Sequence, residues 1–259
     1  MTEVPDWDNK IHPTIKALIQ FVDDRLPTLT STEFPHPRVM AAAYLARVRR
    51  LVMATEALYE AGMSDVVGVP LRVCFEAWVT GMWVVLVGQD AADRLNADYA
   101  IRINHFVERA RLDVEPVPGT EGADQLPNVW QRTDAVGKAL VVAGDEAGSE
   151  LLWAYALVYT GESTTSIHAG FPTAVGYINF DDEDRWAGVQ SDRQDNSDGS
   201  GKLLCAAILL TMLARRVFAE FNIGLDELDE LATPIHLMAT TLNEEQAAQV
   251  ATESADEAS

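Results

Sequence analysis

Apolar residues recur along most of this chain at three- and four-residue spacing, which is the period of an amphipathic α-helix. The stretch 39–62 is the clearest example, and Gly62 is a typical residue at which such a helix ends. Its apolar face consists of Met40, Tyr44, Val48, Leu51, Val52, Thr55, Leu58 and Tyr59. We therefore expect a long helix with one face in the protein core.

The next stretch, 70–88, is apolar nearly all round, which predicts a helix at the centre of the fold. Pro70 fits the first helical turn, where its missing N–H costs nothing. Arg72 and Glu76 argue against a membrane span, because each would cost about 2.5 to 3.5 kcal/mol near a bilayer centre. We expect a buried helix and no membrane contact.

Helical patterns continue through the rest of the chain, at 90–112, 128–143, 149–167, 203–221 and 225–242. The segment near 168–201 breaks the pattern with Pro172, several Gly and two acidic patches, and its aromatic stretch is compatible with a short hairpin. The sequence predicts an all-α fold, a single helical bundle of about six to eight helices with this long irregular segment. We expect residues 1–242 to form that one domain and 243–259 to be an acidic, disordered tail.

Composition adds a strong charge imbalance to this picture. The chain has 259 residues with 40 Asp and Glu against 19 Lys and Arg, a formal net charge of -21, yet it is 48% hydrophobic. That apolar fraction requires a folded core, and the negative charge disfavours binding to nucleic acid. Cys74 and Cys205 lie in apolar runs, as structural thiols do, and the acidic N-terminus does not resemble a signal peptide. We expect a cytoplasmic protein.

The most informative polar residues are Arg72 and Glu76, four residues apart on the apolar helix, where their spacing allows a direct ion pair. One interpretation is a structural clamp that other helices complete with hydrogen bonds. The other is a polar site in the core of the bundle, where the guanidinium holds an anionic or nucleotide-like ligand.

A second polar group follows in the segment 149–167. Tyr155, Tyr159 and Ser163 recur every four residues and so share a helix face, and His168 lies just beyond. These side chains either converge with the Arg and Glu of the central helix or are ordinary core tyrosines and a histidine at the helix end.

Metal and nucleophile motifs are absent from the sequence. Glu56 is expected to face inward, but no Glu-x-x-His motif accompanies it, and the acidic stretch 192–199 lacks the oxygen spacing of a calcium loop. The chain has no Gly-rich phosphate loop, GxSxG elbow or HExxH motif. We expect no metal and no cofactor.

The Arg-x-x-x-Glu of LRVCFEAWVTGMWVVL and the later YALVYTGESTTSIHAG resemble a bacterial and archaeal all-helical domain family of unknown function that is distantly HEPN-like. The resemblance covers roughly 39–221 and implies a polar cluster of Arg72, Glu76, Tyr159, Ser163 and His168, without an assigned reaction. The HEPN ribonuclease signature, an Arg followed four to six residues later by a His, is not present, since Arg102 and His105 are three apart.

Three functions stay open at this point. The first is a binding or stress- and defence-associated module for a small anionic ligand, and the second is a HEPN-like nuclease or nucleotidyl-transfer enzyme with His168 as acid and base. The third is a non-catalytic interaction module whose acidic C-terminal end, with nine acidic residues and no Lys or Arg in 225–259, binds a basic protein partner. A homodimer is compatible with each.

Overall fold

Helix α3 (Gly68–Val87) forms the centre of the fold in the computed structural model of the chain. The structure describes residues 7–29, 36–63, 66–118, 126–145, 148–149, 151–161, 178–180, 186–189 and 200–257. Trp78 of α3 is the largest fully buried side chain among them, and Phe75 of α3 is one of the next largest. The helix begins two residues before Pro70 and is followed by Gly88, whose φ of 78° favours glycine. The prediction of a central apolar helix is confirmed.

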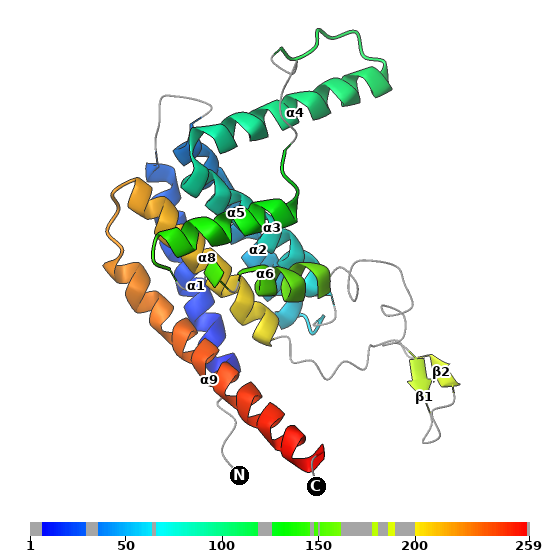
Figure 1. The fold of residues 1–259 in the computed structure, drawn as a ribbon, viewed down its shortest axis with the longest axis vertical. Coiled ribbons are helices and arrows are strands. Elements are labelled where there is room, and N and C mark those ends of the chain that lie inside the picture. Colours follow the sequence, from blue (N-terminus) through cyan, green and yellow to red (C-terminus); the bar gives the residue numbers. More distant parts are fainter. Residues whose placement is uncertain are drawn as a thin grey trace.

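Besides the helix that directly follows it, four further elements pack against α3 (Figure 1). They are α2 (Pro37–Glu60), α8 (Ser200–Glu220), α5 (Val129–Val142) and the π-helical η3 (Tyr155–Gly161). Helices α2, α3 and α8 approach one another closely at Gly81, where a Cβ would lie 3.0 Å from side-chain atoms of Leu213 and Tyr44. A glycine at this position lets the three helices meet.

Helix α1 (Trp7–Arg25) was not among the helices that we predicted. It carries a regular apolar face of Ile11, Ile15, Leu18 and Val22, all buried, so the signal was present in the sequence. It is followed by the short η1 (Leu26–Thr28) and packs beside α9 (Asp226–Glu257) as well as against α8 and α2. Arg25 donates a hydrogen bond to Glu227 of α9 at 2.5 Å.

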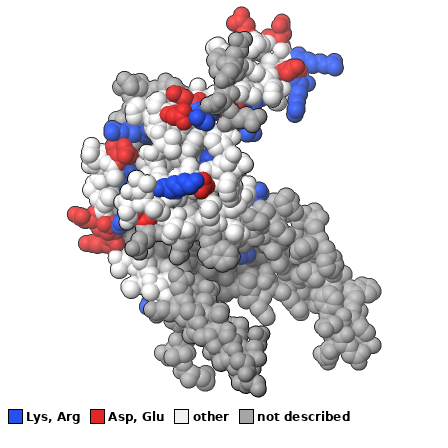
Figure 2. Space-filling view, in the orientation of Figure 1, with Lys and Arg blue, Asp and Glu red and all other residues white. Residues whose placement is uncertain are grey.

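Helix α4 (Gln89–Ala110) begins against the bundle, and its C-terminal end projects away from it (Figure 1). Its first half is anchored by buried Ala91, Ala92 and Leu95, whereas Phe106 in the second half is 62% exposed. The described side chains on the face shown in Figure 2 mix acidic and basic groups, including those on the projecting end of α4. On α2, Arg49 pairs with Asp23 of α1.

The irregular part of the chain contains the short hairpin that its aromatic stretch suggested. Strand β1 (Ile178–Phe180) pairs antiparallel with β2 (Trp186–Val189), with Ile178 opposite Val189. The helix predicted at 149–167 is represented by α6 (Leu151–Ala154) and η3. With its strands confined to this hairpin, the described chain is an all-α helical bundle, as predicted.

Helix α9 continues well beyond the end that we predicted at residue 242 and reaches Glu257. The residues of this extension, mostly Glu, Ala and Gln, have high helix propensity, which explains why the backbone stays helical. The division into a domain of 1–242 and a tail of 243–259 stays a prediction.

Among the described helices, only α3 is long and apolar enough to cross a membrane. Two thirds of its most apolar window, 67%, is buried inside the bundle. That burial is typical of the core helix of a folded domain.

Candidate functional site

A cavity of about 550 Å³ lies where α2, α3, α4 and α5 meet. Its charged lining residues are Arg47 on α2, Glu76 on α3, Asp98 and Arg102 on α4, and Arg132 on α5. Three arginines against two carboxylates give this lining a formal charge of +1, in a chain whose total is -21. The cavity is therefore a local exception to the acidic character of the protein.

Arg132 reaches the cavity from a helix whose start is tightly fixed. Asn128 accepts from the backbone N–H of Gln131 at 2.9 Å, and Gln131 accepts from the backbone N–H of Asn128 at 2.9 Å, a reciprocal capping box. Val129, Val136 and Leu140 are buried on the same side of α5 as Arg132. Packing of this apolar face against the bundle therefore places the Arg132 guanidinium inside the protein.

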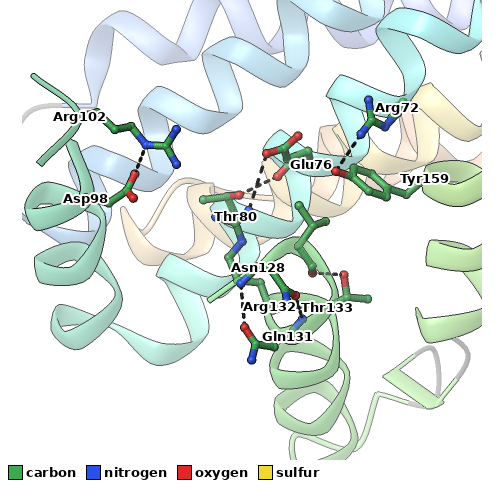
Figure 3. Close-up of polar contacts among 11 residues, drawn as sticks. Arg72, Glu76, Thr80, Asp98, Arg102, Asn128, Gln131, Arg132, Thr133 and Tyr159 are labelled. Carbon is green, nitrogen blue, oxygen red and sulfur yellow. Dashed lines mark hydrogen bonds and ion pairs between the residues drawn. The ribbon is translucent and has the colours of Figure 1, made fainter. Parts of the chain in front are cut away.

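The buried guanidinium of Arg132 is weakly partnered. Its residue is 6% exposed, and Nη2 lies 3.8 Å from Oε1 of Glu76, too far for a hydrogen bond. The Nε atom has no hydrogen-bond partner in the described chain. Figure 3 shows the side chain extending from α5 toward Glu76 and Thr80 of α3. A buried charge with so few hydrogen bonds costs folding free energy.

Arg49 and Arg72 also have a buried Nε, but both make closer contacts. Arg49, whose side chain is 21% exposed, pairs with Asp23, and Arg72 donates through Nη2 to Tyr159 at 3.0 Å. The side chain of Arg132 is only 7% exposed. Arg132 therefore combines deep burial with a long ion pair, and it does so at the wall of a cavity.

Burial lowers the pKa of the Arg132 guanidinium, and the nearby Glu76 carboxylate and Tyr44 oppose that shift. An arginine nonetheless stays charged at neutral pH. Burial raises the pKa of the Tyr44 phenol, so Tyr44 presents a neutral hydroxyl to the cavity that it lines. The lining thus offers a fixed cation and an uncharged hydroxyl side by side.

Two local hydrogen bonds order the polar rim of the cavity (Figure 3). The Thr80 hydroxyl, which is buried, donates to the backbone carbonyl of Glu76 at 2.7 Å. Arg102 donates through Nε to Asp98 at 2.6 Å, and this carboxylate raises the pKa of Arg102. Met40, Val73 and Leu95 supply apolar lining beside these groups. Such a mixture is typical of small-molecule sites.

Arg72 and Glu76 do not form the ion pair that their spacing allowed. Nη2 of Arg72 donates to the hydroxyl of Tyr159 at 3.0 Å, and its guanidinium carbon lies 4.4 Å from the centre of the Tyr159 ring. Glu76 instead faces Arg132 and the cavity (Figure 3). The two side chains diverge because Tyr159 offers Arg72 both an acceptor and an aromatic face.

The contact between Arg72 and Tyr159 belongs to an aromatic cluster that joins η3 to α3. Tyr155 and Tyr159 are stacked with ring centroids 5.1 Å apart, and Phe75 lies 6.3 Å and 6.5 Å from them. This arrangement favours the structural-clamp interpretation of Arg72. Ser163 and His168, the other members of the predicted cluster, lie outside the described residues.

Sequence reasoning missed Arg132, although a signal for it existed. Arg132 falls on the same helical face as Val129 and Val136, three and four residues away, so it is a charge on an apolar stripe. The expectation for Cys74 is confirmed, because this thiol is fully buried and burial raises its pKa.

Comparisons with known proteins found no family model, no curated protein and no solved structure that matches this chain. The resemblance to an all-helical, distantly HEPN-like family therefore stays a prediction.

Proposed function

We propose that this protein is a helical-bundle binding module that holds a small, partly apolar anion in the cavity between α2, α3, α4 and α5. The observation that carries the proposal is the buried guanidinium of Arg132, a residue that lines the cavity, makes only a 3.8 Å ion pair to Glu76 and has an Nε without a hydrogen-bond partner in the described chain.

An anionic ligand would supply what Arg132 lacks. Two oxygens of a carboxylate or phosphate can accept hydrogen bonds from two guanidinium nitrogens at once, in the bidentate geometry that suits an arginine. Glu76, whose side chain is 46% exposed, does not occupy the guanidinium with a hydrogen bond, because the two groups are 3.8 Å apart. Ligand binding would thus offset the free-energy cost of burying the Arg132 guanidinium, which its contacts within the protein do not offset.

The other lining groups indicate the size and character of the ligand. A volume of about 550 Å³ lies within the range of small-molecule sites, roughly 300 to 1,000 Å³. Arg47, which makes no ion pair within the described residues, and the Tyr44 hydroxyl provide further donors, while Met40 and Leu95 provide apolar contact. A carboxylate or phosphate with an apolar or aromatic part fits this lining.

A thermal-shift comparison of matched anionic and neutral compounds tests the proposal. Adenosine monophosphate is compared with adenosine, and octanoate with octanol, on the wild-type chain and on Arg132→Met. We expect at least one anion to raise the melting temperature of the wild type, its neutral partner to have no effect, and the variant to lose the response. Equal responses to anion and neutral partner would contradict the proposal.

The two alternatives receive less support from the described residues. The enzyme alternative depends on His168, which lies outside them, and it stays a prediction. The interaction alternative depends on the acidic C-terminal end, but Glu227 and Asp229 at its start pair with Arg25 and Arg215 of the bundle.

A further inference from the structure

A second polar cluster lies between α1 and α2, apart from the cavity. Nδ1 of His12 is 3.3 Å from Oε1 of Glu56 and 3.9 Å from Oε1 of Glu60. All three ligand-type atoms lie within 4.8 Å of one another. We infer that His12, Glu56 and Glu60 form a binding site for one Zn²⁺ ion.

The distances suit this ion. Ligand atoms at about 2.0 to 2.2 Å from a tetrahedral Zn²⁺ lie about 3.3 to 3.6 Å apart, close to the two separations from His12 Nδ1. Small side-chain rotations would bring the three atoms to these values. Three protein ligands leave the fourth position to water, as in zinc sites that keep an open coordination position. An imidazole nitrogen among the ligands favours Zn²⁺ over Ca²⁺ and Mg²⁺.

Helix geometry holds the three groups in place. Glu56 and Glu60 are four residues apart on α2, so both carboxylates leave the same face of the helix. The ring of His12 packs on Tyr59 with centroids 5.4 Å apart, which orients the imidazole toward them. The inward orientation of Glu56 that its sequence position suggested is confirmed, since its side chain is 8% exposed.

An ammonium group of the protein itself lies beside both carboxylates. Nζ of Lys16 lies 3.0 Å from Oε1 of Glu60 and 3.9 Å from Oε1 of Glu56, the same two oxygens that face His12. Lys16 is 61% exposed and flexible, so its ammonium group can move into solvent. Zn²⁺ would replace it and neutralise both carboxylates, one of which is nearly fully buried.

Calorimetric titration of the metal-stripped full chain with zinc chloride tests the inference. We expect one ion per chain in the wild type, with at least tenfold weaker binding in Glu60→Gln, because this half-exposed ligand can be changed without disturbing the core. Lys16→Gln should bind as tightly as the wild type or more tightly, since it removes the competing ammonium. Glu220→Gln, which changes a surface carboxylate paired with Arg38, is the control and should bind normally.

Two outcomes would overturn the inference. One is no zinc binding to either the wild type or Lys16→Gln. The other is unchanged binding in both Glu60→Gln and Glu56→Gln, with folding of each verified by circular dichroism, which would place the ion elsewhere. Neither outcome depends on the anion cavity, whose lining does not include these residues.

Discussion

Arg132 and Glu76 face each other across 3.8 Å, with the arginine side chain 7% exposed and the glutamate side chain 46% exposed. The cation is therefore inside the protein while its partner is largely in contact with the cavity and solvent. Such an asymmetric pair contributes little to stability, because the cost of burying the guanidinium is not balanced by hydrogen bonds. Because the pair is long, the guanidinium can still donate hydrogen bonds to a second anion.

This relationship predicts that Arg132→Met does not destabilise the protein. Methionine fills a similar volume and removes the buried charge, and Glu76 is exposed enough to remain solvated. We expect the free energy of unfolding in urea to stay equal or to rise by up to about 2 kcal/mol. A loss of about 3 kcal/mol or more would show that the ion pair is structural.

Helix α5 also depends on a close contact between two glycines. A Cβ at Gly137 would lie 2.8 Å from the backbone oxygen of Gly148, which cannot move as a side chain can. We expect Gly137→Ala to lower the free energy of unfolding by about 1 to 2 kcal/mol, because the clash outweighs the gain in helix propensity. Gly201→Ala in α8, where nothing lies within 4 Å of the new Cβ, is the matched control and should be neutral or stabilising.

Alkaline pH should destabilise the protein through its buried acidic groups. Burial raises the pKa of Cys74 above its ordinary 9.0 and that of Tyr44 above its ordinary 10.0. Above pH 9 the unfolded chain loses protons that the folded chain retains, so stability falls as pH rises, by up to about 1.4 kcal/mol per pH unit for each group.

Denaturation in urea at pH 8, 9 and 10 measures this slope. We expect Cys74→Ala to be less stable at pH 8, since it leaves a cavity, but to lose less stability between pH 9 and 10 than the wild type. Parallel profiles for the two proteins would contradict a buried, protonated Cys74.

The hydrogen bond between Arg72 and Tyr159 is expected to be structural. Tyr159→Phe removes the 3.0 Å bond but keeps the ring beneath the guanidinium, so we expect a loss of about 0.5 to 1.5 kcal/mol in unfolding free energy. Anion binding should be unchanged, because neither residue lines the cavity. Weaker anion binding in this variant would show instead that Arg72 contributes to the anion site.

Much of the bundle was predictable because several of its helices carry a regular pattern or a long run of apolar residues. The periodicity of 39–62 and the apolar run of 70–88 fixed the two central helices, with Gly62 and Gly88 just beyond their ends. Helix α1 carried an equally clear pattern that our prediction passed over. The end of α9 was less predictable, because polar residues of high helix propensity are compatible with either a helix or a disordered tail.

The site was harder to predict, for a physical reason. A cavity exists only where four helices fail to fill the space between them, and no local pattern shows how α2, α3, α4 and α5 meet. The spacing of Arg72 and Glu76 permitted a pair, but rotamer choice was decided by Tyr159, which lies 87 residues away from Arg72 in sequence. Arg132 could have been recognised as a charged residue on an apolar helix face, although the sequence does not show that this residue lines a cavity.

Isothermal titration calorimetry with adenosine monophosphate and octanoate is the most direct test of the proposed anion site. Three proteins are compared: the wild type, Arg132→Met, and Arg215→Gln, which changes a surface arginine outside the cavity. We predict that at least one anion binds the wild type and that Arg132→Met weakens it about tenfold to a hundredfold, as expected for lost charged hydrogen bonds. Arg215→Gln should leave the affinity unchanged. Absence of binding by both anions, or equal affinity in Arg132→Met and the wild type, would contradict the account.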